Sequence, residues 1–334
     1  MYTLTMNITE RSKANFTVVS FFSWLILFNL LAVTLIPTNI NPESQSITPK
    51  MATYWVVTDE IHIDNNWSAS EVVYDFIRGS GVYNDPFIIE NITIKNLRDG
   101  NDAITIENTQ DYFIIRNCKI IDSGASIYNS EINLINSTKG TLFNNTLSSN
   151  VGTGISLERC YNISIIENIL FNNTYVGIEL NQSHDNLILQ NNASYQGKDA
   201  SSGFGLSLYK SHNNSISENI FSYNSAIGIL LANSSNNNIS LNTAKHNYLG
   251  LHLTQNSNYN YIIQNDLKDN KYCYVVDNDS EGNTIEDNDC GGVGIEFYFF
   301  LIAFGIVFTL SLIGFIIALK RRRKLKKQRK ELQS

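Results

Sequence analysis

The sequence is poor in cysteine and in charge. Its 334 residues include only four Cys, and Asp, Glu, Lys and Arg together make up 16% of the chain. Four cysteines are too few for a fold that disulfides alone hold together. The net charge is −7 although the C-terminal segment 320–334 is densely basic, so the rest of the chain is strongly acidic. That balance excludes nucleic acid as a partner, because phosphate backbones are bound by basic surfaces.

Two long apolar runs indicate a membrane protein. Residues 16–36 and 295–319 are both long enough to cross a bilayer. The positive-inside rule places the basic tail, residues 320–334, in the cytoplasm together with the N-terminal segment 1–15. The first run is either a cleaved signal peptide or a retained transmembrane helix. The proline-containing residues 37–54 are predicted to be a linker.

The segment between the runs, residues 55–292, is predicted to lie outside the cell and contains a repeat. An aliphatic residue, two variable residues and then Asn recur nine times, at intervals of 23 to 28 residues. Self-similarity at such a period is the mark of a solenoid. The repeated Asn residues are Asn91, Asn117, Asn145, Asn168, Asn191, Asn219, Asn242, Asn265 and Asn288.

A period of about 23 residues is too short for a helix pair and fits one coil of a parallel β-helix. The segments beside each Asn are β-branched and alternate, which is typical of strands with one buried face. We therefore predict an all-β solenoid, a parallel β-helix of about nine coils, in which the Asn residues form one ladder of amide hydrogen bonds. Asn224 lies outside this predicted ladder. A disordered Asn-rich tract is the alternative, but it has no reason to keep a register.

A helix signal precedes the repeat. Ser68-Ala-Ser-Glu71 fits a capping box, and Gly79 and Gly81 would break a helix that begins there. We predict a short helix over residues 67–78 that covers the apolar end of the first coil.

The segment from Gly79 to Ile94, with the Gly-Ile-x-Leu and Asn-x-Ile-x-x-Asn coils after it, resembles the NosD-like right-handed parallel β-helix family. That family belongs to the CASH group of carbohydrate-binding proteins and sugar hydrolases. The resemblance covers about residues 55–292, implies right-handed coils, and with the C-terminal anchor is similar to archaeal cell-surface versions. It implies copper delivery or sugar binding. The set of Cys, Met and clustered His expected for copper delivery is not present, and the chain has three Met in all.

A polysaccharide lyase or hydrolase would need carboxylates facing one another on stacked strands. Glu158 and Glu179 fall on neighbouring coils, but two positions apart along the strand. We interpret them as ordinary surface carboxylates, with a catalytic pair as the alternative.

A transition-metal site is a further hypothesis. His184 and His212 each precede a repeated Asn by seven residues, so their imidazoles are expected about 5 Å apart on stacked coils. With Asp185 they could hold a metal. The alternative is that Ser-His-Asx-Asn is simply a good turn sequence.

The last coil is acidic, and Asp277, Asp279 and Glu281 resemble the start of a calcium loop. Asn288 stands where such a loop needs a bidentate Glu, so a solvated turn is the preferred interpretation and calcium the alternative. Cys273 and Cys290 bracket this coil, and a disulfide between them would hold the end of the solenoid.

One coil is preceded by extra residues, Tyr195 to Phe204, which are expected to form a loop. With Tyr209 nearby, a sugar-stacking patch is conceivable there, and an inert turn is the alternative. Many Asn-x-Ser/Thr triplets would make an extracellular domain a glycoprotein. Together these features favour a cell-surface binding or adhesion protein whose partner is carbohydrate or another surface protein. A carbohydrate-active enzyme and a metal-handling protein are the alternatives.

Overall fold

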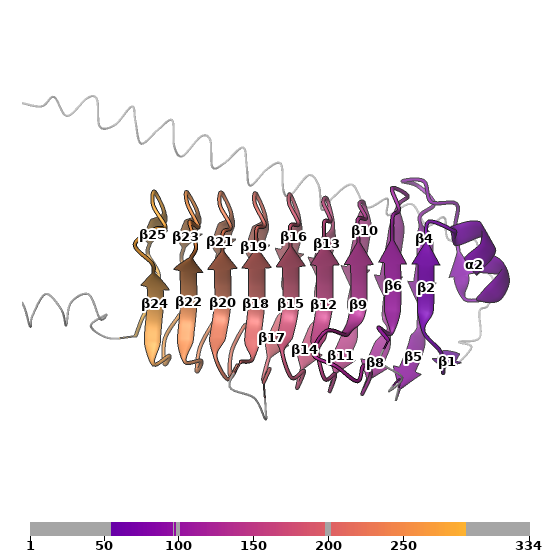
Figure 1. Ribbon diagram of the computed structural model, residues 1–334, viewed down its shortest axis with the longest axis horizontal. Helices are drawn as coiled ribbons and strands as arrows, with labels where there is room; N and C mark the ends of the chain where they lie inside the picture. Colours follow the sequence, from indigo (N-terminus) through magenta and orange to yellow (C-terminus); the bar gives the residue numbers. More distant parts are fainter. Residues whose placement is uncertain (1–54, 96, 98–100, 198–201, 292–334) are drawn as a thin grey trace, which may run out of the picture. The chain divides into compact units, whose positions relative to one another are not determined.

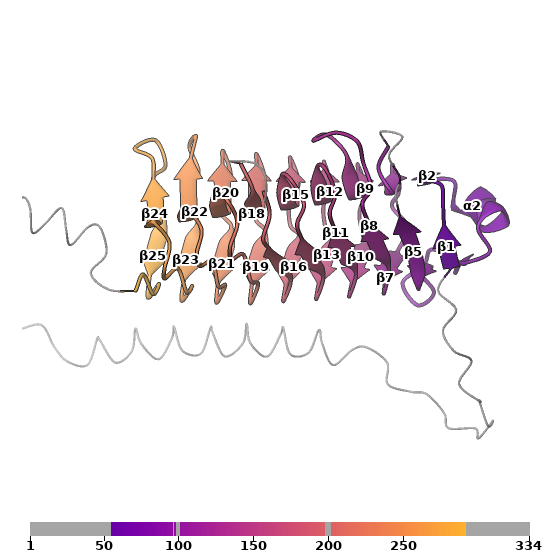
Figure 2. The same ribbon diagram turned by 90° about the horizontal axis from the view of Figure 1, so that it is seen from below.

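The computed structural model of the chain describes residues 55–95, 97, 101–197 and 202–291. Both apolar runs and the basic tail predicted from the sequence lie outside these residues. No helix within the described part is long and apolar enough to span a membrane. The described part is a parallel β-solenoid with three sheets, two of which run along its length while the third covers the earlier coils (Figures 1 and 2). The predicted all-β parallel β-helix is therefore confirmed.

The nine-stranded sheet runs the length of the solenoid, and all its neighbouring strands are parallel. Along each strand every second side chain points into the coil, where it stacks on the equivalent side chain of the next coil. Ile155, Ile178 and Leu206 form one such row and are fully buried. The strands are β2 (Ile61–Asp64), β6 (Ile104–Glu107), β9 (Ser130–Ile135), β12 (Thr153–Glu158), β15 (Val176–Asn181), β18 (Phe204–Tyr209), β20 (Ile227–Ala232), β22 (Leu249–Thr254) and β24 (Tyr272–Val276).

The ten-stranded sheet forms a second wall. Its strands are parallel except for the first pair, β3 and β4, which is antiparallel. Ile165, Ile188 and Ile216 form its central buried row. The strands are β3 (Ile77–Arg78), β4 (Phe87–Glu90), β7 (Phe113–Arg116), β10 (Gly140–Phe143), β13 (Ser164–Ile166), β16 (Leu187–Leu189), β19 (Ser215–Ser217), β21 (Asn238–Ser240), β23 (Tyr261–Ile263) and β25 (Thr284–Glu286).

The six-stranded sheet forms the third wall over the earlier coils. In the later coils its place is taken by single parallel bridges, such as Ile220 with Thr243. The core rows of the three sheets meet inside the coils, and each fully buried Ile or Leu contributes about 1.5–3 kcal/mol. The strands are β1 (Trp55–Val57), β5 (Ile92–Lys95), β8 (Lys119–Ile121), β11 (Thr146–Ser148), β14 (Ile169–Phe171) and β17 (Asn192–Ser194).

The corner between the ten-stranded and six-stranded sheets holds a continuous asparagine ladder. Each side-chain amide donates from Nδ2 to Oδ1 of the Asn in the next coil, for example Asn168 to Asn191 at 2.9 Å. Each Oδ1 also accepts the preceding coil's backbone N–H, for example that of Asn145 at 3.0 Å. Seven of the nine predicted residues lie in this ladder: Asn145, Asn168, Asn191, Asn219, Asn242, Asn265 and Asn288.

The prediction was wrong for Asn91 and Asn117. Both occupy the corner position one residue before the ladder, with φ of 56° and 53°. Asn tolerates this left-handed backbone better than most residues. The ladder positions of these coils hold Ile92 and Cys118 instead, and the Cys118 N–H donates to Asn145 Oδ1 at 2.9 Å. A slip of one residue exchanges inward and outward positions, so two adjacent polar residues cannot be told apart by spacing alone.

Three more ladders were not predicted. Two consist mainly of Asn and one of Ser, and in each the side-chain oxygen accepts a backbone N–H from the preceding coil. Asn224 lies outside the predicted ladder, as expected, but it belongs to one of these, because its Oδ1 accepts the Gln196 N–H at 2.9 Å. The members are Asn186, Asn214, Asn237, Asn260 and Asn283; Asn150, Asn173, Gln196, Asn224, Asn247 and Asn270; and Ser183, Ser211, Ser234, Ser257 and Ser280.

Helix α2 (Trp67–Val73) covers the N-terminal end of the core, as predicted, but it is shorter than residues 67–78. Its N-cap is Asn66, whose side chain caps no N–H of the helix, so the predicted Ser68 capping box is wrong. Strand β3 follows in place of further helix because it pairs with β4. Trp67 is 2% exposed and its ring stacks on Phe87 at 4.6 Å between centroids. Apolar packing thus closes this end of the solenoid.

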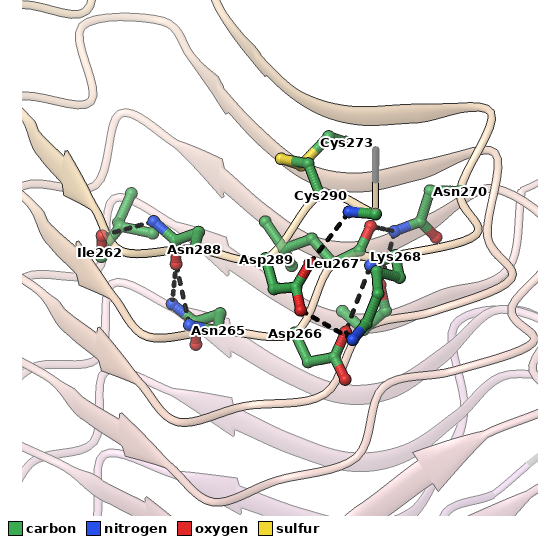
Figure 3. The surroundings of a disulfide bond; sticks show 12 residues. Ile262, Asn265, Asp266, Leu267, Lys268, Asn270, Cys273, Asn288, Asp289 and Cys290 are labelled. Atoms are coloured by element: carbon green, nitrogen blue, oxygen red, sulfur yellow. Dashed lines mark hydrogen bonds and ion pairs between the residues drawn. A yellow bond between two sulfur atoms is a disulfide. The ribbon is translucent and has the colours of Figure 1, made fainter. Parts of the chain in front are cut away.

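The C-terminal end is held by a disulfide. Cys273 in β24 is bonded to Cys290, which follows the last rung of the asparagine ladder (Figure 3). Asn288 accepts from Asn265 at 2.9 Å and donates to the Ile262 carbonyl at 2.9 Å. The disulfide therefore joins the two ends of the final coil, which has a neighbouring coil on one side only.

The second position of strands β12, β15, β18 and β20 is glycine in consecutive coils. At Gly177 a Cβ would lie 2.7 Å from the Gly205 carbonyl oxygen, too close for any other residue without a shift of the backbone. Gly154 and Gly228 are equivalent. In the coil of β9 the same position holds Glu131, whose side chain is fully buried and whose carboxylate oxygens have no hydrogen-bond partner among the described residues.

Candidate functional site

The outer face of the nine-stranded sheet is the best candidate for a functional site. The chain between β8 and β9, and that between β17 and β18, are both longer than the equivalent connection between β11 and β12. Both connections lead from the six-stranded to the nine-stranded sheet, in which β12 and β15 lie between β9 and β18. Tyr128 in the first of them is 88% exposed. Extended loops on one face of a solenoid often mark its binding face.

Glu179 lies on this face, at an outward position of β15. The register places Ser156 of β12 and Ser207 of β18 beside it. The side chain is partly buried, and burial raises the pKa of its carboxyl above the ordinary value. A titratable group with a perturbed pKa on an accessible face is a marker of function.

Tyr175 stands at the start of the same strand. Burial raises the pKa of its phenol, and the carboxylate of Glu179, further along the same strand, raises it further. The Tyr175 ring packs edge-on against Phe204 of β18, with 5.9 Å between ring centroids. This cluster offers aromatic surface, a hydroxyl and a carboxyl to a ligand.

A row of apolar side chains continues from the cluster along the sheet. Phe204, Ile227, Leu249 and Tyr272 are in register at the start of β18, β20, β22 and β24, and all four are partly exposed. Coils repeat about every 4.8 Å, so this row presents a regular apolar track parallel to the solenoid axis. Sequence reasoning missed the row, because a single apolar residue at a strand start is indistinguishable from core.

Glu158 does not pair with Glu179. The register aligns Glu158 with Asn181, two residues beyond Glu179, and Glu158 forms an ion pair with Arg159. The coils on either side of Glu179 present Ser156 and Ser207 at its position, not a second acid. The geometry agrees with the staggered arrangement expected from the sequence and gives no opposed carboxylates for glycoside cleavage.

His184 and His212 stack as expected, with 5.1 Å between ring centroids and an interplanar angle of 5°. Their Nδ1 atoms are already engaged: His184 Nδ1 accepts the His212 N–H at 3.0 Å, and His212 Nδ1 accepts the Ser235 N–H at 2.9 Å. A neutral ring that accepts at Nδ1 carries its proton on Nε2, which leaves no lone pair for a metal. Asp185 is exposed, with a left-handed backbone. The Nδ1 atoms of the stacked rings are thus used in hydrogen bonds between the turns of successive coils.

The acidic side chains of the last coil likewise do not converge on one point. Asp277 accepts from Thr254 Oγ1 at 2.5 Å and lies 3.2 Å from His252 Nε2. These two hydrogen bonds, in that order, lower the pKa of its carboxyl. Asp279 accepts from Ser280 at 3.4 Å, and Glu281 is exposed. Across the described residues no three His, Cys, Asp or Glu side chains converge as a metal site would require.

The chain matches two family descriptions. Residues 52–200 match "Right handed beta helix region", and residues 198–293 match "Periplasmic copper-binding protein (NosD)". The fold and these matches define the class as right-handed parallel β-helix proteins. Within that class the later coils, residues 198–293, are similar to the NosD family. Copper does not fit the described residues, because the one stacked His pair uses its Nδ1 atoms internally and the two free cysteines are buried.

Several solved structures have a similar fold. The periplasmic alginate epimerase AlgG is 15% identical with a TM-score of 0.49, and the alignment covers 61% of this chain and 58% of AlgG. Tailspike protein 2 of bacteriophage CBA120 is 14% identical with a TM-score of 0.47, and the alignment covers 62% of this chain and 35% of the tailspike chain. PfbA, a surface adhesin of Streptococcus pneumoniae, is 17% identical with a TM-score of 0.44, and the alignment covers 61% of this chain and 61% of PfbA. The chain thus spans less than two thirds of each. A search of curated proteins gave no match.

Proposed function

We propose that this chain is a membrane-anchored cell-surface protein that binds carbohydrate on the outer face of its nine-stranded sheet without cleaving it. The observation that carries the proposal is the cluster of Tyr175, Glu179 and Phe204 at the head of a regular apolar track. Aromatic rings pack on the C–H faces of sugars, while hydroxyl, carboxyl and serine groups bond sugar hydroxyls. A track that repeats at every coil suits an extended polymer.

Sequence features support the anchoring. The apolar run 295–319 begins a few residues after the last described coil, and the basic tail 320–334 is suited to the cytoplasmic side of a membrane. A protein partner on another cell surface would use the same exposed track.

Binding is favoured over cleavage because Glu179 has no opposed carboxylate. One observation favours the second candidate, a carbohydrate-active enzyme: the raised pKa of the Glu179 carboxyl would suit a general acid.

The test is a glycan array probed with the full-length protein in detergent micelles, with calcium and with chelator. The matched variants are Tyr175→Ala and Glu179→Gln on the face, and Tyr83→Ala, an exposed tyrosine away from it. We expect binding that the two face variants weaken at least tenfold and the control leaves unchanged. Absence of binding to every glycan, or equal binding by all variants, would refute the carbohydrate proposal. New reducing ends released by the wild type but not by Glu179→Gln would establish the enzyme instead.

A further inference from the structure

Three rings stack on one another at the outer surface of the solenoid. They occupy the same corner of three successive coils, next to the six-stranded sheet and the bridges that continue it. Tyr195 and Tyr223 lie 4.9 Å apart between centroids at an interplanar angle of 2°, and Tyr223 and His246 lie 4.5 Å apart at 18°. The Tyr195 side chain is 54% exposed and that of Tyr223 47% exposed. We call these three residues the ring row. Because the rings stack face to face, both faces of the central Tyr223 ring are covered and its exposed surface lies at its edge.

The backbone at the ring row is unfavourable for such residues. Tyr195, Tyr223 and His246 have φ of 62°, 59° and 55°, in the left-handed region where bulky side chains are uncommon. The equivalent corner in neighbouring coils holds small polar residues, Asn172 on one side and Asp269 on the other. The corner therefore does not require rings for folding. At this corner the stacked rings are a feature of these three coils and not of the coils on either side.

A hollow of about 420 Å³ lies beside the ring row. The ring row forms its wall, and the outer side chains of three successive coils form its floor. Two of the floor hydroxyls are already committed, because Ser194 Oγ accepts the Ser222 N–H at 3.2 Å and Ser222 Oγ accepts the Lys245 N–H at 3.0 Å. Within the described residues the phenol hydroxyls of the two tyrosines have no hydrogen-bond partner. The floor residues are Asn192, Ser194, Ile220, Ser222, Thr243 and Lys245.

The charges beside the hollow are paired. Lys245 Nζ lies 2.5 Å from Asp266 Oδ2, and His246 Nε2 lies 3.9 Å from Asp269 Oδ2. A sulfate, phosphate or uronate would find no unpaired cation here. Ile220, 42% exposed, and the ring edges offer apolar contact, while the phenol hydroxyls can both donate and accept. This combination suits a ligand that is uncharged, rich in hydroxyls and partly apolar.

We propose that this hollow is a second binding site, which takes a neutral oligosaccharide. It lies over the six-stranded sheet and the bridges that continue it, whereas the face proposed above belongs to the nine-stranded sheet. The two sites share no residue, so each can be removed without the other.

The test is isothermal titration of the full-length protein in detergent with maltohexaose, cellohexaose and mannohexaose, and with a mannuronate hexamer as the charged comparison. Tyr223→Asn replaces the central ring by the residue type that the coil before the ring row has at the same corner, Asn172, so we expect the fold to be preserved. Tyr259→Asn is the matched control, since Tyr259 is also exposed, with φ of 55°, but does not line the hollow.

We expect a neutral hexamer to bind and its Kd to rise at least tenfold in Tyr223→Asn, with no change in Tyr259→Asn. A site on the nine-stranded sheet would instead respond to Tyr175→Ala, so the two proposals fail separately. Absence of binding by all three neutral hexamers, unchanged affinity in Tyr223→Asn, or tighter binding of the mannuronate hexamer would overturn this inference.

Discussion

Replacing Asn219 by Leu tests the asparagine ladder at its centre. Asn219 is 1% exposed and takes part in five side-chain hydrogen bonds. Its Oδ1 accepts from Asn191 N and Nδ2 at 2.8 and 2.9 Å, and its Nδ2 donates to Ile188 O, Ser217 O and Asn242 Oδ1, each at 2.9 Å. Leu has a similar size but makes none of these bonds.

The energetic loss can be estimated bond by bond. The Asn191 N–H would be left buried with no partner, which costs about 1–3 kcal/mol of stability. The Asn191 side chain would keep its hydrogen bonds to two carbonyls. The other lost bonds contribute roughly 0.5–1.5 kcal/mol each, partly offset by the apolar Leu. We expect the free energy of unfolding to fall by about 3–5 kcal/mol, measured by urea denaturation of the bacterially expressed protein followed by circular dichroism.

Asn238→Leu is the matched control, because Asn238 is exposed on β21, in the neighbouring coil. Its effect should stay within about 0.5 kcal/mol. Asn224→Leu should also destabilise, because Asn224 Oδ1 accepts the buried Gln196 N–H. Equal effects of Asn219→Leu and Asn238→Leu would show that the ladder does not stabilise the coil.

The remaining predictions concern buried and terminal features. Burial raises the pKa of Glu131 well above its ordinary value, so the folded state favours the protonated carboxyl and loses stability as pH rises above about 4.3. Glu131→Gly should remove this decrease of the unfolding free energy with pH, measured by urea titrations between pH 4 and 8. An unchanged pH dependence in the variant would contradict this reasoning. Cys273→Ser should lower the free energy of unfolding by about 3 kcal/mol, and reductant should have that effect on the wild type only. Trp67→Ala should cost about 3–5 kcal/mol in the same assay, since Trp67 also donates to Thr109 at 3.0 Å; a loss under 1 kcal/mol would show that α2 does not seal the core.

The fold was predictable because the same sequence period recurs in many successive coils. Each coil repeats the same alternation, so errors in one coil do not disturb the assignment of the next. The rows that begin with Ile155 and Ile165 follow directly from this alternation. The stacking of His184 on His212 and the disulfide of the last coil also follow from positions equivalent or adjacent in the repeat.

The corners were harder to predict than the strands. Each corner places a left-handed residue beside an inward one, and both positions favour Asn, so Asn117 was mistaken for a ladder residue. Asn224 was missed because its ladder also contains Gln196, which breaks the pattern of a single residue type.

The candidate sites depend on register between coils that differ in length. The alignment of Phe204 with Ile227 requires knowing where the loop before β18 ends, which spacing does not reveal. The patch of Tyr195, Phe204 and Tyr209, raised from the sequence beside an inert turn, is divided among different partners for the same reason. Tyr195 stacks on Tyr223, Phe204 packs against Tyr175, and the Lys210 ammonium lies 5.0 Å from the Tyr209 ring centroid.

The ladders also make the length of the protein adjustable. Ladder bonds and strand pairs in the later coils join residues 23 apart, such as Asn219 with Asn242 and Ser211 with Ser234. Removal of residues 220–242 would bring Asn219 onto Asn265, with every other ladder still in phase. A gene that gains or loses one such unit changes the length of the solenoid by about 4.8 Å. The helix that covers the first coil and the disulfide of the last coil are kept. Coil number is therefore a property that selection can tune independently of what the surface binds.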